Sequence, residues 1–128
     1  MSDNIIFDSS IWIDIARRIK RTISFASSFI EENNVLVVDL ICAEVLRGAH
    51  SEKDYNNLNK ILHDFEMLRT DWSEVARLAY LVSRKGFNPP LADLYIANCA
   101  IENDVGILTR DKHFLAISSV RKFKVITL

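Results

Sequence analysis

The chain contains few of the residues that interrupt or cross-link a fold: its 128 residues include three glycines, two prolines and two cysteines. So little proline and glycine argues against long linkers, and we expect one domain over residues 1–128. Cys42 and Cys99 have neither a Cys-x-x-Cys partner nor a histidine at metal-ligand spacing. This excludes a disulfide framework, and we expect both to be buried in a reducing compartment.

Long hydrophobic runs and an excess of one charge are also missing. No apolar run reaches the ~18 residues of a membrane-spanning helix, and the first residues lack the basic segment and long apolar core of a signal peptide. We therefore expect a cytoplasmic protein without a membrane association. The net charge of −1 excludes a general DNA-coating protein, which would be strongly basic. It allows a nuclease with an acidic site and local basic patches.

Short apolar runs alternate with longer stretches of helical spacing. Continuous apolar runs such as 35–38 are typical of strands buried on both faces, whereas apolar residues at spacings of three and four indicate helices. The expected strands are residues 4–7, 35–38, 105–109 and 124–127, with a possible short strand at 67–69. The expected helices cover about residues 11–19, 22–32, 39–48, 51–65, 71 or 73 to 86, and 91–102.

The residues between these elements fit turns and helix starts. Ser9 and Ser10 provide N-cap chemistry, and we interpret Asp39 and Asp71 as N-caps. The pair Asn33-Asn34 is expected to form a turn. Strands that alternate with helices predict an α/β fold with a mainly parallel sheet covered on both sides. Ligands of such sheets bind beyond the carboxyl ends of the strands, where the strand order reverses.

Four acidic side chains are expected at that edge. Asp8 ends the first strand, and Asp111 follows a later one. Glu44 lies in the early turns of the helix after the second strand, and Asp93 lies in the first turn of the last predicted helix. Glu44 and Asp93 stand in apolar surroundings, where a carboxylate is costly unless it is paired or bound to a metal.

A cluster of acids repels itself unless some members are protonated or a cation neutralises the group. Oxygen ligands select hard ions, so Mg²⁺ or Mn²⁺ fits and Zn²⁺ does not. The histidines, His50, His63 and His113, show no ligand spacing. Such an ion can orient a phosphodiester and activate a water molecule, which makes a metal-dependent nuclease the favoured interpretation.

Each acid also has a structural alternative. Asp8 and Asp111 could be caps, and Asp93 could be stabilised by the helix macrodipole. Glu44 is the hardest to explain as a structural residue, and the conjunction of all four favours a site.

Several neighbours of these acids have their own expected roles. Ser10 and Thr109 are candidates to orient Asp8 and Asp111, with capping or strand packing as the alternative. Asp14 is expected to be exposed, and Trp12 to belong to the core.

Four segments together resemble the motifs of PIN-domain ribonucleases, and most of all those of the VapC-type toxins of toxin–antitoxin pairs. The segments are Ile5-Ile6-Phe7-Asp8-Ser9-Ser10-Ile11-Trp12-Ile13-Asp14, Ala43-Glu44-Val45-Leu46-Arg47-Gly48-Ala49, Pro90-Leu91-Ala92-Asp93-Leu94-Tyr95-Ile96-Ala97 and Leu108-Thr109-Arg110-Asp111-Lys112-His113-Phe114. They occur in the family's order over nearly the whole chain. One departure is Leu91, where many members have a hydroxyl.

The resemblance implies a PIN-like three-layer α/β/α sandwich with a short, mainly parallel central sheet. It implies a Mg²⁺- or Mn²⁺-dependent endoribonuclease, a homodimer and a small antitoxin that blocks the site. Carried over residue by residue, Asp8, Glu44, Asp93 and Asp111 are the family's four acids, and Ser10 matches the hydroxyl or amide position after the first.

Local basic residues are the candidates for RNA contacts. Arg17 and Arg18 belong to a basic run that could equally be a solvated helix face, and Arg110 and Lys112 flank the fourth acid. A non-catalytic PIN-like RNA-binding or scaffold protein remains the alternative function. A receiver domain is excluded because serines follow Asp8 in place of a second acid.

Overall fold

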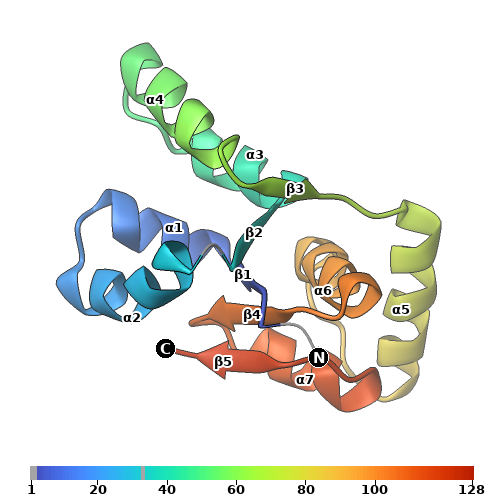
Figure 1. The fold of residues 1–128 in the computed structure, drawn as a ribbon. Helices are drawn as coiled ribbons and strands as arrows, with labels where there is room; N and C mark the ends of the chain where they lie inside the picture. The colour runs from blue at the N-terminus through green and yellow to red at the C-terminus, as the bar shows by residue number, and fades with distance from the viewer. Residues whose placement is uncertain (1–2, 33) are drawn as a thin grey trace.

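The computed structural model describes residues 3–32 and 34–128, which form seven helices and five strands (Figure 1). Asn33, half of the expected Asn33-Asn34 turn, lies outside the described residues, as do Met1 and Ser2. The strands are β1 (Ile5–Phe7), β2 (Val35–Val38), β3 (Glu66–Leu68), β4 (Gly106–Thr109) and β5 (Val125–Thr127). The helices are α1 (Ser9–Ala16), α2 (Lys20–Glu31), α3 (Asp39–Arg47), α4 (Glu52–Leu62), α5 (Trp72–Arg84), α6 (Leu91–Asn103) and α7 (His113–Val120).

The strands form one all-parallel sheet in the order β3-β2-β1-β4-β5. The three central strands are buried along their whole length, as their continuous apolar sequences predict, whereas β3 and β5 at the edges are partly exposed. The chain moves outward from β1 through β2 to β3 and then crosses to β4 and β5. The strand order therefore reverses between β1 and β4, which is where a parallel sheet usually binds its ligand.

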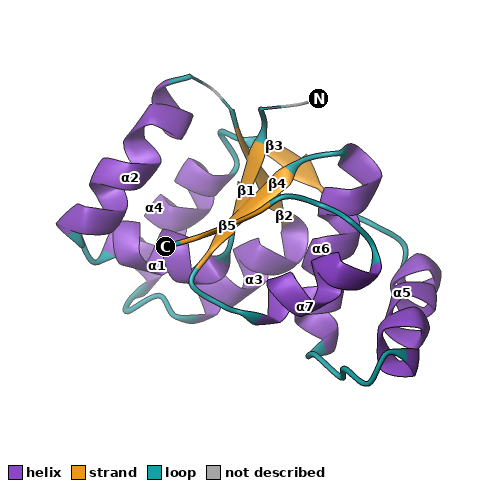
Figure 2. Ribbon diagram, turned by 90° about the horizontal axis from the view of Figure 1, so that it is seen from below, coloured by secondary structure: helices purple, strands orange, loops and turns teal. Residues whose placement is uncertain are grey.

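Helices cover both faces of the sheet and complete a three-layer α/β/α sandwich. Figure 2 shows α1, α2 and α4 on one side, and α5, α6 and α7 on the other. Helix α3 contacts both α1 and α6, so it connects the two layers near the carboxyl ends of the strands. Among the described residues, the helices are too short or too polar to cross a membrane.

Aromatic side chains fill the core on the α1 side of the sheet. The ring of Trp12 lies 5.4 Å from that of Phe7 and 5.3 Å from that of Phe65, and Phe29 meets Phe7 edge to face. Trp12 is buried, which confirms its expected place in the core and makes it unavailable as a stacking surface. This packing fixes the start of α1, which carries the serines after Asp8.

The structure changes two of the expected helix starts. The N-cap of α1 is Asp8, whose carboxylate accepts a hydrogen bond of 2.8 Å from the Ser9 N–H, so Ser9 and Ser10 lie within the helix. Helix α3 already begins at Asp39, so Asp39 is its first residue and not its cap. The cap at Asp71 is confirmed by its 2.9 Å hydrogen bond from the Ser73 N–H.

Helices α1 and α7 also differ from expectation. Helix α1 ends at Ala16 instead of continuing to residue 19, because Arg18 takes a left-handed conformation with a φ of 59°. Helix α7 was not expected at all. Its short sequence mixes β-branched residues with serines, which favour helices weakly.

Candidate active site

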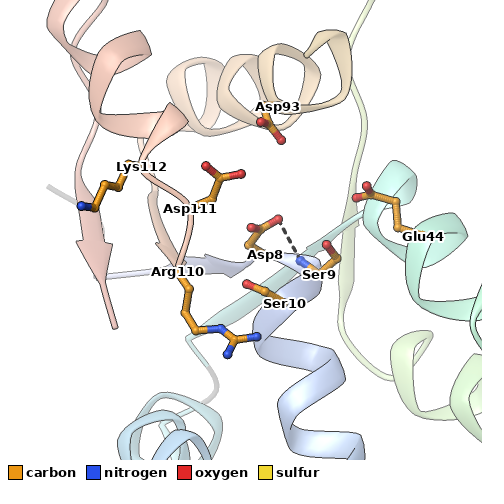
Figure 3. Close-up of a pocket in the computed structure, with 8 residues that line it drawn as sticks. All are labelled: Asp8, Ser9, Ser10, Glu44, Asp93, Arg110, Asp111 and Lys112. Atoms are coloured by element: carbon orange, nitrogen blue, oxygen red, sulfur yellow. Dashed lines mark hydrogen bonds between the residues drawn. The ribbon is translucent and has the colours of Figure 1, made fainter. Parts of the chain in front are cut away.

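Eight residues line a cavity of about 640 Å³ at the carboxyl ends of β1 and β4 (Figure 3). They are Asp8, Ser9, Ser10, Glu44, Asp93, Arg110, Asp111 and Lys112. The four predicted acids thus meet in one pocket, although they come from four separate elements. In Figure 3 the carboxylates of Glu44, Asp93 and Asp111 surround the space next to Asp8.

Asp8 lies at the bottom of the pocket, only 6% exposed. The Thr109 hydroxyl donates to its Oδ2 at 2.8 Å, and the Ser9 N–H donates to its Oδ1 at 2.8 Å. Burial raises the pKa of Asp8 above its ordinary value, and these hydrogen bonds oppose that shift only in part. The same Thr109 oxygen accepts a 2.9 Å hydrogen bond from the Asp111 N–H, so it joins the first and fourth acids.

Ser10 was expected to orient Asp8. Its hydroxyl is buried and makes no clear hydrogen bond with the residues that the structure describes. It lies close enough to Asp8 to favour the ionised carboxylate and so to oppose the rise in its pKa. The position of Ser10 is compatible with an orienting role, which stays a prediction.

Glu44 projects from α3 toward the other acids (Figure 3). Its Oε1 is buried and has no hydrogen-bond partner within residues 3–32 and 34–128. Burial raises the pKa of Glu44, and the negative charges of Asp8 and Asp93 raise it further. A buried carboxylate oxygen without a partner is costly, and a bound cation or a proton would offset that cost.

Asp93 and Asp111 share a neighbour that the sequence did not identify as a potential ligand. The Nδ1 of His113 lies 2.9 Å from Oδ2 of Asp93 and 3.1 Å from Oδ1 of Asp111. Burial raises the pKa of Asp93, whereas the hydrogen bond with His113 lowers it; the same hydrogen bond raises the pKa of His113. Each of these three side chains offers one potential metal-ligand atom, and the three atoms lie within 4.8 Å of one another.

His113 escaped the sequence analysis because its partner Asp93 is distant in the chain. Spacing alone gave no reason to include a histidine among the candidate ligands, and the structure places the His113 ring beside Asp93 and Asp111. The one available signal was the position of His113 in the turn just after Asp111, where α7 begins.

The predicted basic residues separate into two groups. Arg110 and Lys112 line the acidic pocket, although Lys112 points away from the acids in Figure 3. Arg17 lines a different depression, next to Val45, and Arg18 is exposed. Of the four predicted basic residues, Arg110 and Lys112 therefore lie at the pocket, whereas Arg17 and Arg18 do not line it.

Fold and pocket together define a parallel α/β protein with an acidic site at its switch point. The family model of the PIN domain matches residues 5–119, and the chain belongs to this family. A comparison with curated proteins found no match.

Solved structures of the same fold include toxin–antitoxin assemblies. FitAcB from Neisseria gonorrhoeae superposes with a TM-score of 0.72 at 21% identity, over 96% of either chain. VapBC2 from Rickettsia felis, bound to a promoter DNA fragment, has a TM-score of 0.79 at 15% identity, over 97% of this chain and 98% of that one. A toxin–antitoxin complex from Klebsiella pneumoniae has a TM-score of 0.75 at 17% identity, over 97% of each chain. At such identities the likeness concerns the fold.

Proposed function

We propose that the chain is a metal-dependent endoribonuclease that acts as the toxin of a toxin–antitoxin pair. The observation that carries this proposal is the convergence of Asp8, Glu44, Asp93 and Asp111 on one pocket at the switch point of the sheet. Burial raises the pKa of three of them. A protein gains nothing in stability from such mutual repulsion, so the cluster is best explained by a cation.

The donor set fits a divalent cation. The carboxylates offer hard oxygen ligands. The buried Oε1 of Glu44, which has no hydrogen-bond partner among the described residues, is one such oxygen. Asp8, Glu44, Asp93 and Asp111 would hold Mg²⁺ or Mn²⁺. When bound, the ion would lower the pKa of a water molecule and polarise the phosphodiester.

The chain's own groups would prepare the site for that chemistry. Thr109 holds the Asp8 carboxylate in one orientation and fixes the backbone of Asp111 through the same oxygen. Arg110 adds positive charge at the edge of the pocket, where the RNA backbone would approach. The cleaved bond would be an RNA phosphodiester, hydrolysed by a water molecule.

The partners follow from the relatives and the family resemblance. FitAcB, VapBC2 and the complex from Klebsiella pneumoniae support a small antitoxin as partner. The homodimer is implied by the family resemblance alone. Cys42 and Cys99 are free and buried, in keeping with a reducing cytoplasm.

A cleavage assay tests the proposed function. Purified protein is incubated with labelled RNA in Mg²⁺ or in Mn²⁺, in chelator, and as the Asp8→Asn variant. We expect cleavage only by the unaltered protein with metal. Equal cleavage in every arm would show that the reaction needs neither the metal nor Asp8, and it would reject the proposal.

The alternative is a non-catalytic PIN-like RNA-binding or scaffold protein. It predicts RNA binding in a gel-shift assay without cleavage in any metal. A small basic or DNA-binding protein encoded just upstream would support the toxin assignment, and co-expression with it should abolish cleavage. Light scattering of the purified chain tests the homodimer.

A further inference from the structure

Asp14 is a buried acid outside the four. It was expected to be exposed on its helix, but it is 4% exposed, so that expectation was wrong. The reason lies in two contacts from other elements. The Thr22 hydroxyl of α2 donates to Oδ2 of Asp14 at 2.7 Å, and Nη2 of Arg110 lies 3.1 Å from its Oδ1. Both carboxylate oxygens are therefore occupied, as a buried charge requires.

The Arg110 side chain runs from the end of β4 along the edge of the pocket, and its guanidinium reaches the buried Asp14. Its side chain is 51% exposed and lines the acidic cavity, and Figure 3 places its guanidinium beside Ser10 at the edge. Arginine carries five N–H donors in a planar fork. One end of the fork is held by Asp14, which leaves donors free to face an incoming group.

We propose that Arg110 is a fixed phosphate-binding group and that Asp14, together with Thr22, is the positioning element that holds it. The ligand would be a phosphodiester of the RNA backbone next to the bond that is cut. This inference rests on the proposed function, because it assigns a substrate contact to the same pocket.

Charge explains why such a contact is needed. Four carboxylates repel a polyanion, and metal ions neutralise them only locally. An arginine at the edge attracts the phosphate, and its fork matches the geometry of two phosphate oxygens. The anchor at Asp14 fixes the side chain before RNA arrives, so binding loses less conformational entropy than it would with a free arginine.

Other basic side chains offer a contrast. Within the described residues, Arg110 is the one arginine or lysine that both lines the acidic pocket and forms an ion pair with a buried acid. Arg84, at the end of α5, is exposed and does not line the pocket. It provides a matched control for the loss of one surface charge.

The first experiment measures RNA binding without cleavage. All variants are made in an Asp8→Asn background, and the anisotropy of a fluorescein-labelled single-stranded oligoribonucleotide is followed at several salt concentrations. Arg110→Ala should make the negative slope of log K against log salt shallower by about 0.7, which corresponds to a loss of about fivefold at 0.1 M salt. Arg84→Ala should leave both values close to those of the background.

The second experiment tests the positioning role of Asp14. Simple electrostatics predicts that Asp14→Asn tightens RNA binding, since a negative charge is removed. Our proposal predicts weaker binding, because Arg110 loses its anchor, and a higher KM at similar kcat in the otherwise unaltered enzyme. The double variant Asp14→Asn/Arg110→Ala should bind RNA no more weakly than Arg110→Ala alone. Circular dichroism and melting temperatures check that each variant is folded.

The outcomes separate the inference from the function on which it rests. If the chain cleaves RNA and Arg110→Ala binds like the background, the phosphate contact is rejected and the proposed function stands. If the double variant binds more weakly than Arg110→Ala, Asp14 acts by another route and its positioning role is rejected. If the background chain binds no RNA and the unaltered chain cleaves none, both proposals fail.

Discussion

The hydroxyl of Thr109 donates a hydrogen bond of 2.8 Å to the Asp8 carboxylate, although the two residues are 101 positions apart in the chain. The contact follows from the register of β1 and β4, which pairs Phe7 with Leu108. The residues that follow this pair, Asp8 and Thr109, therefore meet at the carboxyl edge of the sheet. One hydroxyl thereby ties two of the four acids to the parallel pairing at the centre of the fold.

Thr109→Val should weaken both the site and the fold. The substitution keeps the shape but removes the donor to Asp8 and the acceptor for the Asp111 N–H. We expect the free energy of unfolding to fall by about 2 kcal/mol and Mn²⁺ affinity to fall by about 10- to 100-fold. Urea denaturation and calorimetric titration measure the two effects. Thr109→Ser retains the hydroxyl and should stay near the original values; equal losses in both variants would contradict the role of the hydrogen bond.

Glu44→Gln should stabilise the metal-free protein and weaken its response to metal. The amide removes a like charge from a pocket in which burial already disfavours that charge. We expect the melting temperature in chelator to rise by roughly 2–5 °C, the shift that about 1 kcal/mol produces in a domain of this size. The further rise on addition of Mn²⁺ should shrink. Glu66 is an exposed acid on edge strand β3. Glu66→Gln should change neither the melting temperature in chelator nor its rise on addition of Mn²⁺.

The stability of the metal-free protein should decrease as pH rises. The pKa values of Asp8, Glu44 and Asp93 are raised in the folded state, so above their ordinary values of 3.8 and 4.5 the folded chain binds more protons than the unfolded chain. The free energy of unfolding then falls with rising pH across that window. The raised pKa of His113 acts in the same direction: its contribution is complete below the ordinary value of 6.5 and is lost above it.

Urea denaturation in chelator between pH 5 and pH 8 measures this dependence. His113→Ala should flatten the upper part of the curve, and Glu44→Gln the lower part. A stability that rises with pH in the unaltered protein would contradict the raised pKa values. Added Mn²⁺ should reduce the dependence, because the metal replaces the protons on the acids.

Tyr95→Phe should weaken the fold and leave metal binding almost unchanged. The Tyr95 hydroxyl donates to Oδ2 of Asp39 at 3.1 Å and accepts from the Thr70 N–H at 3.2 Å, so it links α6 to α3 and to the segment after β3. Its loss should lower the free energy of unfolding by about 1 kcal/mol. Mn²⁺ affinity should stay within about twofold, since Tyr95 does not line the pocket. A large loss of affinity would show that this link also positions Asp93.

The sequence predicted the sheet well because the central strands are buried on both faces. Such strands need continuous apolar runs, and Val35–Val38 is unmistakable in that respect. The acids could be found for a related reason. Glu44 and Asp93 interrupt apolar helical stretches. Acids are rarely buried without a partner, so such an interruption can be recognised from the sequence alone. Their roles as ligands stay a prediction.

The features that escaped prediction depend on contacts between distant residues. The burial of Asp14 results from Thr22 and Arg110, and the contact between His113 and Asp93 joins α7 to α6. Neither pairing leaves a periodic pattern in the sequence. Helix α7 was missed because two buried residues, Phe114 and Ile117, are too few to establish a period.

The pairing of β1 with β4 also has a consequence for protein synthesis. Strand β4 follows β1 in the chain only after β2, β3 and helices α1 to α6, yet the two strands are neighbours in the sheet. Until residues 106–111 have left the ribosome, Asp8 lacks its hydrogen bond from Thr109, and Asp111 cannot join the other three acids. A shorter nascent chain therefore lacks the complete acidic pocket. If the chain is a toxin, the ribosome that makes it is not exposed to its activity until residues 106–111 have emerged.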